Sequence, residues 1–367
     1  MNEAPDNRTI ASVVGARPQF IKAAVVSRAL DKSGADEFIV HTGQHYDYGM
    51  SQLFFRELAI PEPRLNLGIG SGPHGRQTGA MLEALEKVFI DTAPRMVLIY
   101  GDTNSTLAGA LAAAKLHIPL AHVEAGLRSF NMRMPEEINR MLADRISSLL
   151  FCPTETAVEN LRREGVTDGV QMCGDVMFDA ALFYAGRAPT LSETAAGDLV
   201  ENEFYLATVH RAENTDDPER LKNIFAALGS LPRTVVLPIH PRTRGRIGEL
   251  GLEPGGALRI VEPVGYLEMV ALERAARVIL TDSGGMQKEA LFHGTPCVTL
   301  RDETEWVETV EAGWNVLAGA SPDNIRAAVE RFDSGGPGEP PRLYGDGDAG
   351  ARVARTLNAF IGGRGEG

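Results

Sequence analysis

Residues 10–30, IASVVGARPQFIKAAVVSRAL, contain the pattern that decides the fold class. Residues 10–14 are mostly apolar, which predicts a buried strand, and Gly15 supplies the turn that follows it. Between residues 19 and 30 the apolar side chains recur at close to helical spacing. A strand that leads through a glycine turn into a helix is typical of a parallel sheet with helical crossovers.

The same alternation continues along the chain. It predicts strands at residues 38–41, 96–100, 120–123 and 149–152, and again at 204–208, 234–239, 258–261, 278–281 and 297–300. Thr156 and Glu159 predict a capping box at the start of the helix after residue 152. Residues 187–203, rich in small, polar and acidic side chains, indicate a surface segment near a domain boundary. The sequence therefore predicts an α/β protein with two doubly wound Rossmann-like domains, residues 1–179 and 180–348, that face a cleft.

Composition narrows the class of protein. The chain has 367 residues, 44% hydrophobic and 23% charged, which is typical of a folded globular protein. Its net charge of −13 argues against broad contact with nucleic acid or anionic lipid. We expect no signal peptide and no membrane span, because no apolar run reaches about 18 residues. Cys152, Cys173 and Cys297 lack metal-site spacing and indicate buried thiols of a cytoplasmic protein.

Common nucleotide and hydrolase motifs are absent from the sequence. There is no GxxxxGK[ST], HExxH or GxSxG motif, which excludes P-loop, zincin and serine-hydrolase chemistry of those types. Residues 68–72, GIGSG, imitate a dinucleotide loop, but Pro73 falls where the helix would begin. We therefore expect no nicotinamide cofactor at this loop.

Charged residues follow the predicted strands of the first half. Arg17 and Lys22 come after Gly15, where a helix N-terminus favours an anion, and a plain turn with two surface cations is the alternative. Further along lies a group of carboxylates with nearby cations: Asp102, Glu124, Glu136, His122, Arg128 and Arg140. Clustered carboxylates raise one another's pKa, so one can hold a proton while another accepts one. A network of ion pairs is the alternative for this group.

The second half repeats the arrangement with groups suited to phosphate. Ser283, Gly284 and Gly285 follow a predicted strand and open a helix, so their amides and hydroxyl favour a phosphate. Glu289, further along that helix, can accept hydrogen bonds from ribose hydroxyls. His210 and His240 each stand at a strand end beside an arginine, which suits a pyrophosphate.

A collinear set of motifs resembles the non-hydrolysing UDP-N-acetylglucosamine 2-epimerase family: GARPQFIK, TGQH, GDTNST, HVEAGLRS, MPEEINR, HRAEN, TDSGG with Glu289, and TEW. The resemblance extends over residues 10–316. It implies a GT-B-like fold in which a C-terminal helix, residues 349–367, crosses back to the first domain. It also implies a homodimer that binds a UDP-sugar and needs neither a metal nor a cofactor.

The resemblance also implies a reaction. The family eliminates UDP across C1 and C2 to a 2-acetamidoglucal and adds it back with a proton on the other face. By position in the motifs, the acid and base candidates are Asp102, Glu124 and Glu136, and the sequence leaves open which one removes the proton. His210 is a further catalytic candidate, and it would hold the pyrophosphate together with Arg17. Ser283, Gly284 and Gly285 would bind phosphate, and Glu289 would bind the ribose. Lys22, Arg140 and His240 would support the site.

Several segments are more similar to one subgroup of the family. Residues 174–177 and 295–302, and the short loop at 129–134, resemble enzymes acting on UDP-2,3-diacetamido-2,3-dideoxyglucuronate. The extra carboxylate of that sugar would find a partner in Arg76, Arg133 or Arg242. UDP-N-acetylglucosamine, converted to UDP-N-acetylmannosamine, is the other candidate substrate. Two functions outside the family stay open: a GT-B glycosyltransferase with a UDP-sugar donor, and a non-catalytic UDP-sugar sensor.

Overall fold

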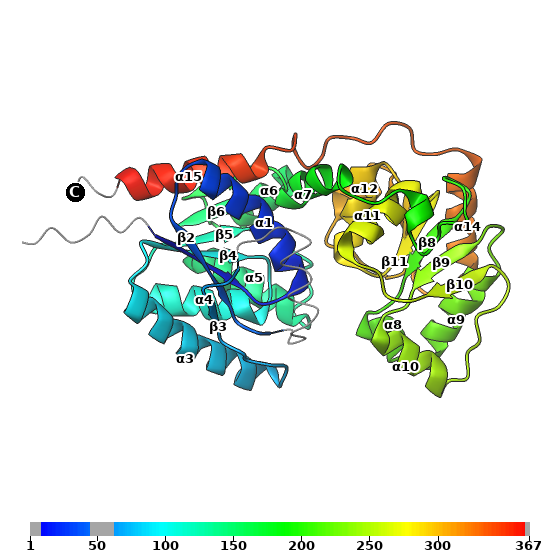
Figure 1. Ribbon diagram of the computed structural model, residues 1–367, viewed down its shortest axis with the longest axis horizontal. Coiled ribbons are helices and arrows are strands. Elements are labelled where there is room, and N and C mark those ends of the chain that lie inside the picture. The colour runs from blue at the N-terminus through cyan, green and yellow to red at the C-terminus, as the bar shows by residue number, and fades with distance from the viewer. Residues whose placement is uncertain (1–8, 45–61, 364–367) are drawn as a thin grey trace, which may run out of the picture. The chain divides into compact units, whose positions relative to one another are not determined.

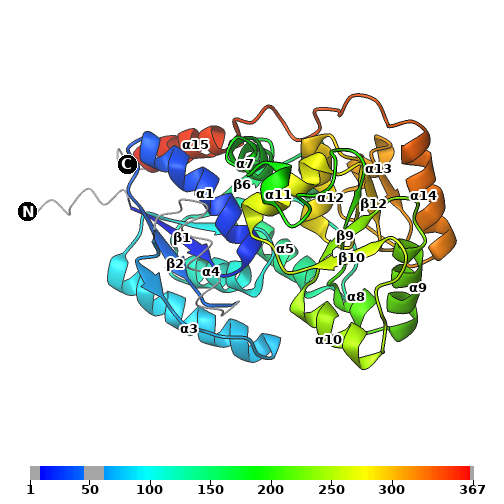
Figure 2. The same ribbon diagram turned by 45° about the vertical axis from the view of Figure 1, so that its right-hand side comes forward.

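Parallel strands alternate with helices along residues 9–44 and 62–363, the part of the chain that this computed structural model describes. Contacts between residues divide the chain into two units, which Figures 1 and 2 show in two views. Unit 1 comprises Met1–Ala180 and Leu343–Gly367, and unit 2 comprises Ala181–Arg342.

Unit 1 is built on one parallel sheet with the strand order β3-β2-β1-β4-β5-β6-β7. Its strands are β1 (Ile10–Val14), β2 (Glu37–His41), β3 (Leu65–Asn66), β4 (Met96–Tyr100), β5 (Leu120–Val123), β6 (Leu149–Cys152) and β7 (Val170–Met172). The chain order reverses between β1 and β4. In a doubly wound sheet, ligands bind outside the carboxyl ends of the strands at such a reversal.

Helices cover both faces of this sheet. They are α1 (Arg17–Lys32), α3 (His74–Thr92), α4 (Asn104–Lys115), α5 (Pro135–Ile146), α6 (Glu155–Arg163) and α15 (Ala349–Gly363). Helix α7 (Val176–Ala185) begins in unit 1 and ends in unit 2. Apolar side chains of α3, α4 and α5 pack with β1, β2 and β4 into one core. The C-terminal helix α15 lies beside α1 (Figure 1), so the chain returns to unit 1 after completing unit 2.

Unit 2 repeats the design with the strand order β10-β9-β8-β11-β12-β13. Its strands are β8 (Tyr205–Thr208), β9 (Val235–Pro238), β10 (Leu258–Val261), β11 (Val278–Thr281), β12 (Cys297–Thr299) and β13 (Asn315–Leu317). Its helices are α8 (Ala212–Thr215), α9 (Pro218–Gly229), α10 (Pro241–Glu249), α11 (Tyr266–Ala275), α12 (Gly284–His293), α13 (Val307–Glu311) and α14 (Pro322–Ser334), with a 3₁₀ turn at Leu191–Glu193. One core joins the sheet to α9, α10 and α14, and a second joins it to α11 and α12.

The structure confirms the predicted fold class and the predicted strands, whose bounds differ by at most one residue at each end. The sequence pattern missed β3, β7 and β13, because two or three half-exposed residues give too short an apolar signal. The predicted capping box at Thr156 and Glu159 is wrong. Thr154 caps α6 instead, because it is the extended residue whose side chain accepts a hydrogen bond from the amide of Ala157, at 3.2 Å.

The division into independently folding domains, and the cleft between them, stay predictions. All three cysteines are buried free thiols. Within residues 9–44 and 62–363, no helix combines the length and apolarity that crossing a membrane requires.

Candidate active site

The turn after β1 is held in place by one glutamine side chain. Gln19 Oε1 accepts hydrogen bonds from the amides of Gly15 and Ala16, at 2.8 and 3.0 Å, and its amide nitrogen donates to the carbonyl of Tyr100 at 2.7 Å. This glutamine thereby joins the carboxyl ends of β1 and β4. A Cβ at Gly15 would overlap the hydroxyls of Ser105 and Thr42, so this close approach requires glycine.

Glu124 and Lys22 form an ion pair at the carboxyl end of β5. The two side chains are almost fully buried, and Glu124 has the left-handed φ of +72°. A non-glycine residue in this conformation carries strain, which is typical of functional sites. Gly101 lies against the pair, because a Cβ there would be 3.2 Å from Lys22 Nζ and 3.3 Å from Glu124 Oε2. The pair therefore lies next to the turn that carries Asp102.

Asp102 belongs to a group of ion pairs in which Arg140 lies between two carboxylates. Arg140 contacts Asp102 Oδ2 at 2.5 Å and Glu137 Oε2 at 2.8 Å, and the Asp102 side chain is 30% exposed. Burial alone would raise the pKa of Glu137, but hydrogen bonds from Ser129, Phe130 and Arg140 hold it below its usual value. Glu137 therefore stays ionised and keeps Arg140 directed at Asp102.

Glu136 differs from its neighbour Glu137. It lies in the first turn of α5, half-buried, and within the described part of the chain it forms no hydrogen bond or ion pair. Its carboxyl group is thus available to a ligand. Arg17 begins α1, and the position of its side chain falls outside the described part, as does His45 of the TGQH motif.

In unit 2, a buried aspartate organises the turn that carries His210. Asp282 accepts hydrogen bonds from the amides of His210 and Arg211, each at 3.0 Å, and from the side chain of Asn214 at 3.1 Å. It also lies 3.4 Å from His210 Nδ1. The His210 ring, 35% exposed, lies 5.7 Å from that of His240, which caps α10. The two histidines therefore share one edge of the sheet.

Ser283 is the N-cap of α12, and Gly284 and Gly285 begin that helix. The first amides of a helix have no acceptor within it, which suits an anion. A Cβ at Gly284 would overlap Glu305 Oε1, whereas the space beside Gly285 is open. The open side of the helix start is therefore at Gly285.

Glu289 lies in the same helix and is only 9% exposed. Burial, reinforced by the charge of Glu289, raises the pKa of the neighbouring Glu273 well above its ordinary value. Burial and the neighbouring carboxylate therefore both favour the protonated form of Glu273.

A sequence profile described as UDP-N-acetylglucosamine 2-epimerase matches residues 28–358. The chain belongs to this family. It is 53% identical, over 355 residues, to UDP-2,3-diacetamido-2,3-dideoxy-D-glucuronate 2-epimerase of Pseudomonas aeruginosa, covering 95% of this chain and 99% of that one.

Solved structures agree with the family. The epimerase of Methanocaldococcus jannaschii, in complex with UDP-GlcNAc and UDP, matches with a TM-score of 0.87 and 44% identity over 96% of this chain and 99% of that one. The calicheamicin glycosyltransferase CalG4 matches with a TM-score of 0.58 at 16% identity, over 97% of this chain and 98% of that one, a likeness that shows the fold alone. This member of the epimerase family therefore has the GT-B-like fold that its motifs imply.

Sequence reasoning about this epimerase-family chain missed several residues at the two strand-end edges. Glu137 and Asp144 share the buried face of α5 with Arg140, and their spacing of three and four residues was the available signal. Asp282 stands directly before the phosphate motif. His122 and Arg128, which we expected beside the exposed carboxylates, are instead buried and bonded to Asp144.

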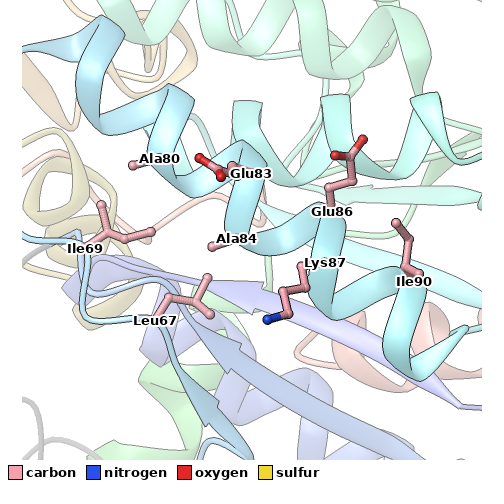
Figure 3. Close-up of a pocket in the computed structure, with 8 residues that line it drawn as sticks. All are labelled: Leu67, Ile69, Ala80, Glu83, Ala84, Glu86, Lys87 and Ile90. Carbon is pink, nitrogen blue, oxygen red and sulfur yellow. The ribbon is translucent and has the colours of Figure 1, made fainter.

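A surface hollow lies between the segment after β3 and helix α3 (Figure 3). It measures about 480 Å³ and is lined by residues after β3 and along α3: Leu67, Ile69, Ala80, Glu83, Ala84, Glu86, Lys87 and Ile90. None of the residues implied by the family motifs lines it. The hollow therefore has no part in the proposed chemistry.

Proposed function

We propose that this chain is a non-hydrolysing epimerase that inverts C2 of a UDP-2-acetamido sugar. One observation carries the proposal: Asp102 and Glu124 follow the neighbouring strands β4 and β5, and each is paired with a buried cation. Two carboxylates that lie at the same edge of a sheet suit this reaction, because one can remove a proton from the sugar and the other can deliver one.

The proposed reaction has two steps. A carboxylate takes the proton from C2, the C1–C2 double bond forms, and the C1–O bond breaks with its electron pair going to UDP. UDP oxygen then attacks C1 of the 2-acetamidoglucal while a carboxylic acid delivers a proton to the opposite face of C2. Asp102, Glu124 and Glu136 are the proposed acid and base groups. Lys22 and Arg140 fix the first two.

Residues of unit 2, together with Arg17 of unit 1, would bind the UDP moiety. We assign the pyrophosphate to His210 and Arg17, with His240 in support, and phosphate contacts to Ser283, Gly284 and Gly285. Because Glu305 fills the space beside Gly284, Gly285 and Ser283 are the more accessible of the three. Glu289 would accept hydrogen bonds from the ribose hydroxyls.

For the sugar, we favour UDP-2,3-diacetamido-2,3-dideoxyglucuronate over UDP-N-acetylglucosamine. The 53% identity to the Pseudomonas aeruginosa enzyme supports this choice. Among the arginines considered for the extra carboxylate, Arg242 is already bound to Asp216 and Thr215, at 2.6 and 2.9 Å. Arg76 and Arg133 are exposed and are the better candidates.

Proton NMR of the purified protein in D2O with each UDP-sugar in turn tests the proposal. We expect a C2-inverted product that carries deuterium at C2, and the faster sugar identifies the substrate. D102N and E124Q should bind UDP but lose turnover by about 100-fold or more, the usual contribution of acid–base groups. Full activity in both variants would contradict the site assignment.

Other results of the same experiment would support the alternative functions. Irreversible consumption of the UDP-sugar only when an acceptor is added would indicate a glycosyltransferase. Binding of the UDP-sugar without exchange at C2 would indicate a sensor. Either result would overturn the epimerase proposal.

We also propose, from the family resemblance, a cytoplasmic homodimer. Light scattering should give twice the mass of one chain, which is 39.5 kDa. A mass equal to one chain at micromolar concentration would contradict the dimer.

A further inference from the structure

His122 on β5 is a buried group that the proposed chemistry leaves unused. Its Nδ1 lies 2.7 Å from Asp144 Oδ1, and its Nε2 lies 2.7 Å from the carbonyl oxygen of Gly101. Neither His122 nor Asp144 is exposed. We propose that His122 is a positioning residue: a buried imidazolium that fixes the turn bearing Asp102 relative to the turn bearing Glu124. This inference rests on the proposed function in so far as those two carboxylates perform the chemistry.

The bonding partners require both ring nitrogens of His122 to carry hydrogen. A carbonyl oxygen can only accept, so Nε2 donates to Gly101. Asp144 also accepts hydrogen bonds from the amide of Gly126, at 3.1 Å, and from Arg128 at 2.7 Å. Those are the bonds of an ionised carboxylate, so Nδ1 must donate as well.

The surroundings balance the buried positive charge. Arg128 bonds to Asp144 and also makes two parallel hydrogen bonds to Glu164, at 2.7 and 2.8 Å. With His122 the group holds two cations and two carboxylates, and buried charges are stable only when paired in this way. Burial acts to raise the pKa of Asp144, but the hydrogen bonds and charges of His122 and Arg128 bring it below its ordinary value.

The network reaches both turns through backbone atoms. Gly101 has the left-handed φ of +60°, and its amide donates to the carbonyl of Val123 at 3.0 Å while its own carbonyl accepts from His122. Asp144 holds the amide of Gly126, two residues after Glu124. Removal of His122 would release the Gly101 carbonyl beside Asp102 and leave Gly126 in place. The two carboxylates would then lose their fixed separation.

The protonation state can be measured without any substrate. The chain has eight histidines, and ¹⁵N-labelled histidine in the full-length protein reports the two ring nitrogens of each. The signals of His122 are assigned by their loss in H122N. We expect two nearly equal nitrogen shifts, the signature of an imidazolium, in the folded protein. Widely separated shifts, the signature of a neutral ring, would overturn the inference even if the protein proves to be an epimerase.

Turnover of the UDP-sugar tests the positioning role. The amide nitrogen of Asn replaces Nδ1 and that of Gln replaces Nε2, so H122Q keeps the bond to Gly101 and H122N loses it. We expect H122N to lower kcat by about 100-fold, because a misplacement of about 1 Å costs that much, and to change KM by less than about threefold. H122Q should retain a clearly larger share of kcat than H122N.

A control histidine lies in the turn that precedes β5. His117 is exposed and has a φ of +58°, a conformation that Asn tolerates, so H117N should keep the kcat of the original protein. Wild-type kcat in H122N, or equal loss in H122N and H122Q at matched melting temperatures, would overturn the positioning role. Absence of turnover in the unsubstituted protein would instead contradict the proposed function, and the NMR measurement would still decide the state of His122.

Discussion

Glu136 and Glu137 show that adjacent residues can have separate tasks. Glu137 is buried and accepts hydrogen bonds from the backbone amides of Ser129 and Phe130 and from Arg140. Glu136, half-buried in the same helical turn, forms no such bond among the described residues. The first is suited to hold the loop and Arg140 in place, and the second to exchange a proton with a ligand.

Amide substitutions should separate these two tasks. E137Q removes one of the two carboxylates that pair with the buried Arg140. We therefore expect the free energy of unfolding to fall by about 2–4 kcal/mol. E136Q should leave that free energy within about 0.5 kcal/mol of its original value, as partly exposed positions do. Its kcat should nevertheless fall by about 100-fold or more.

Urea unfolding and the NMR assay together measure both effects. The pKa of Glu137 is depressed in the folded protein, so its contribution to stability is present at neutral pH and is lost as pH falls below about 4.5. The stability difference between E137Q and the original protein should therefore shrink on acidification. Equal stability at neutral pH would contradict the structural role of Glu137.

At the scale of elements, the sequence predicts what is buried and apolar. The central strands of both sheets are nearly continuous apolar runs, and their pattern predicts them to within a residue at each end. Helix α5 is different, because its buried face carries Glu137, Arg140 and Asp144, while its exposed residues include Met141 and Leu142. The rule that apolar residues face the core therefore predicts the wrong buried face for this helix. The ion pairs of the candidate site were therefore found only from the structure.

The C-terminal helix α15 is held to unit 1 at its first turn. Asp179 accepts hydrogen bonds from the amides of Ala349 and Gly350, at 3.2 and 2.8 Å. Burial, assisted by the nearby Asp175 and Asp348, raises the pKa of Asp179 to about 6. A Cβ at Gly350 would be 3.3 Å from the carbonyl of Val25 on α1, so α1 and α15 lie close together.

The raised pKa of Asp179 predicts a pH-dependent attachment of α15. The folded state binds the proton more tightly than the unfolded state, so this stabilisation is complete below about pH 4 and is lost as pH rises through 6. The loss amounts to at most about 1.4 kcal/mol per pH unit over that range. D179N cannot titrate, so its stability relative to the original protein should increase between about pH 4 and 6.

Hydrogen exchange localises the effect to α15. The amide protection of residues 349–363, compared between D179N and the original protein at each pH, should diverge as pH rises. Protection of α5, which does not contact Asp179, serves as the internal control. Parallel pH profiles for α15 in the two proteins would show that the ionisation of Asp179 is not linked to the docking of this helix.

At the scale of the whole molecule, the proposed function requires an acidic protein to bind an anionic UDP-sugar. The net charge of −13 repels such a ligand at long range, so binding depends on local groups. In the sequence these groups were recognisable as motifs at strand ends. Their partners, such as Asp282 and Asp144, come from segments far away in the chain, and no single-sequence pattern predicts which long-range pairs form.

The proposed division of labour between the units gives a test that compares two variants. If Glu289 of unit 2 holds the ribose and Asp102 of unit 1 takes part in the chemistry, E289Q should weaken UDP binding by about tenfold, the effect of losing one strong hydrogen bond. D102N should bind UDP with unchanged affinity while losing turnover. Calorimetric titration with UDP and with 2′,3′-dideoxy-UDP measures the affinities of both variants and of the original protein. Loss of the ribose hydroxyls should weaken binding to the original protein and leave binding to E289Q nearly unchanged. Equal discrimination against the dideoxy nucleotide by E289Q and the original protein would show that Glu289 does not hold the ribose. Weakened UDP binding by D102N would show that nucleotide binding and catalysis do not depend on separate residues in this way.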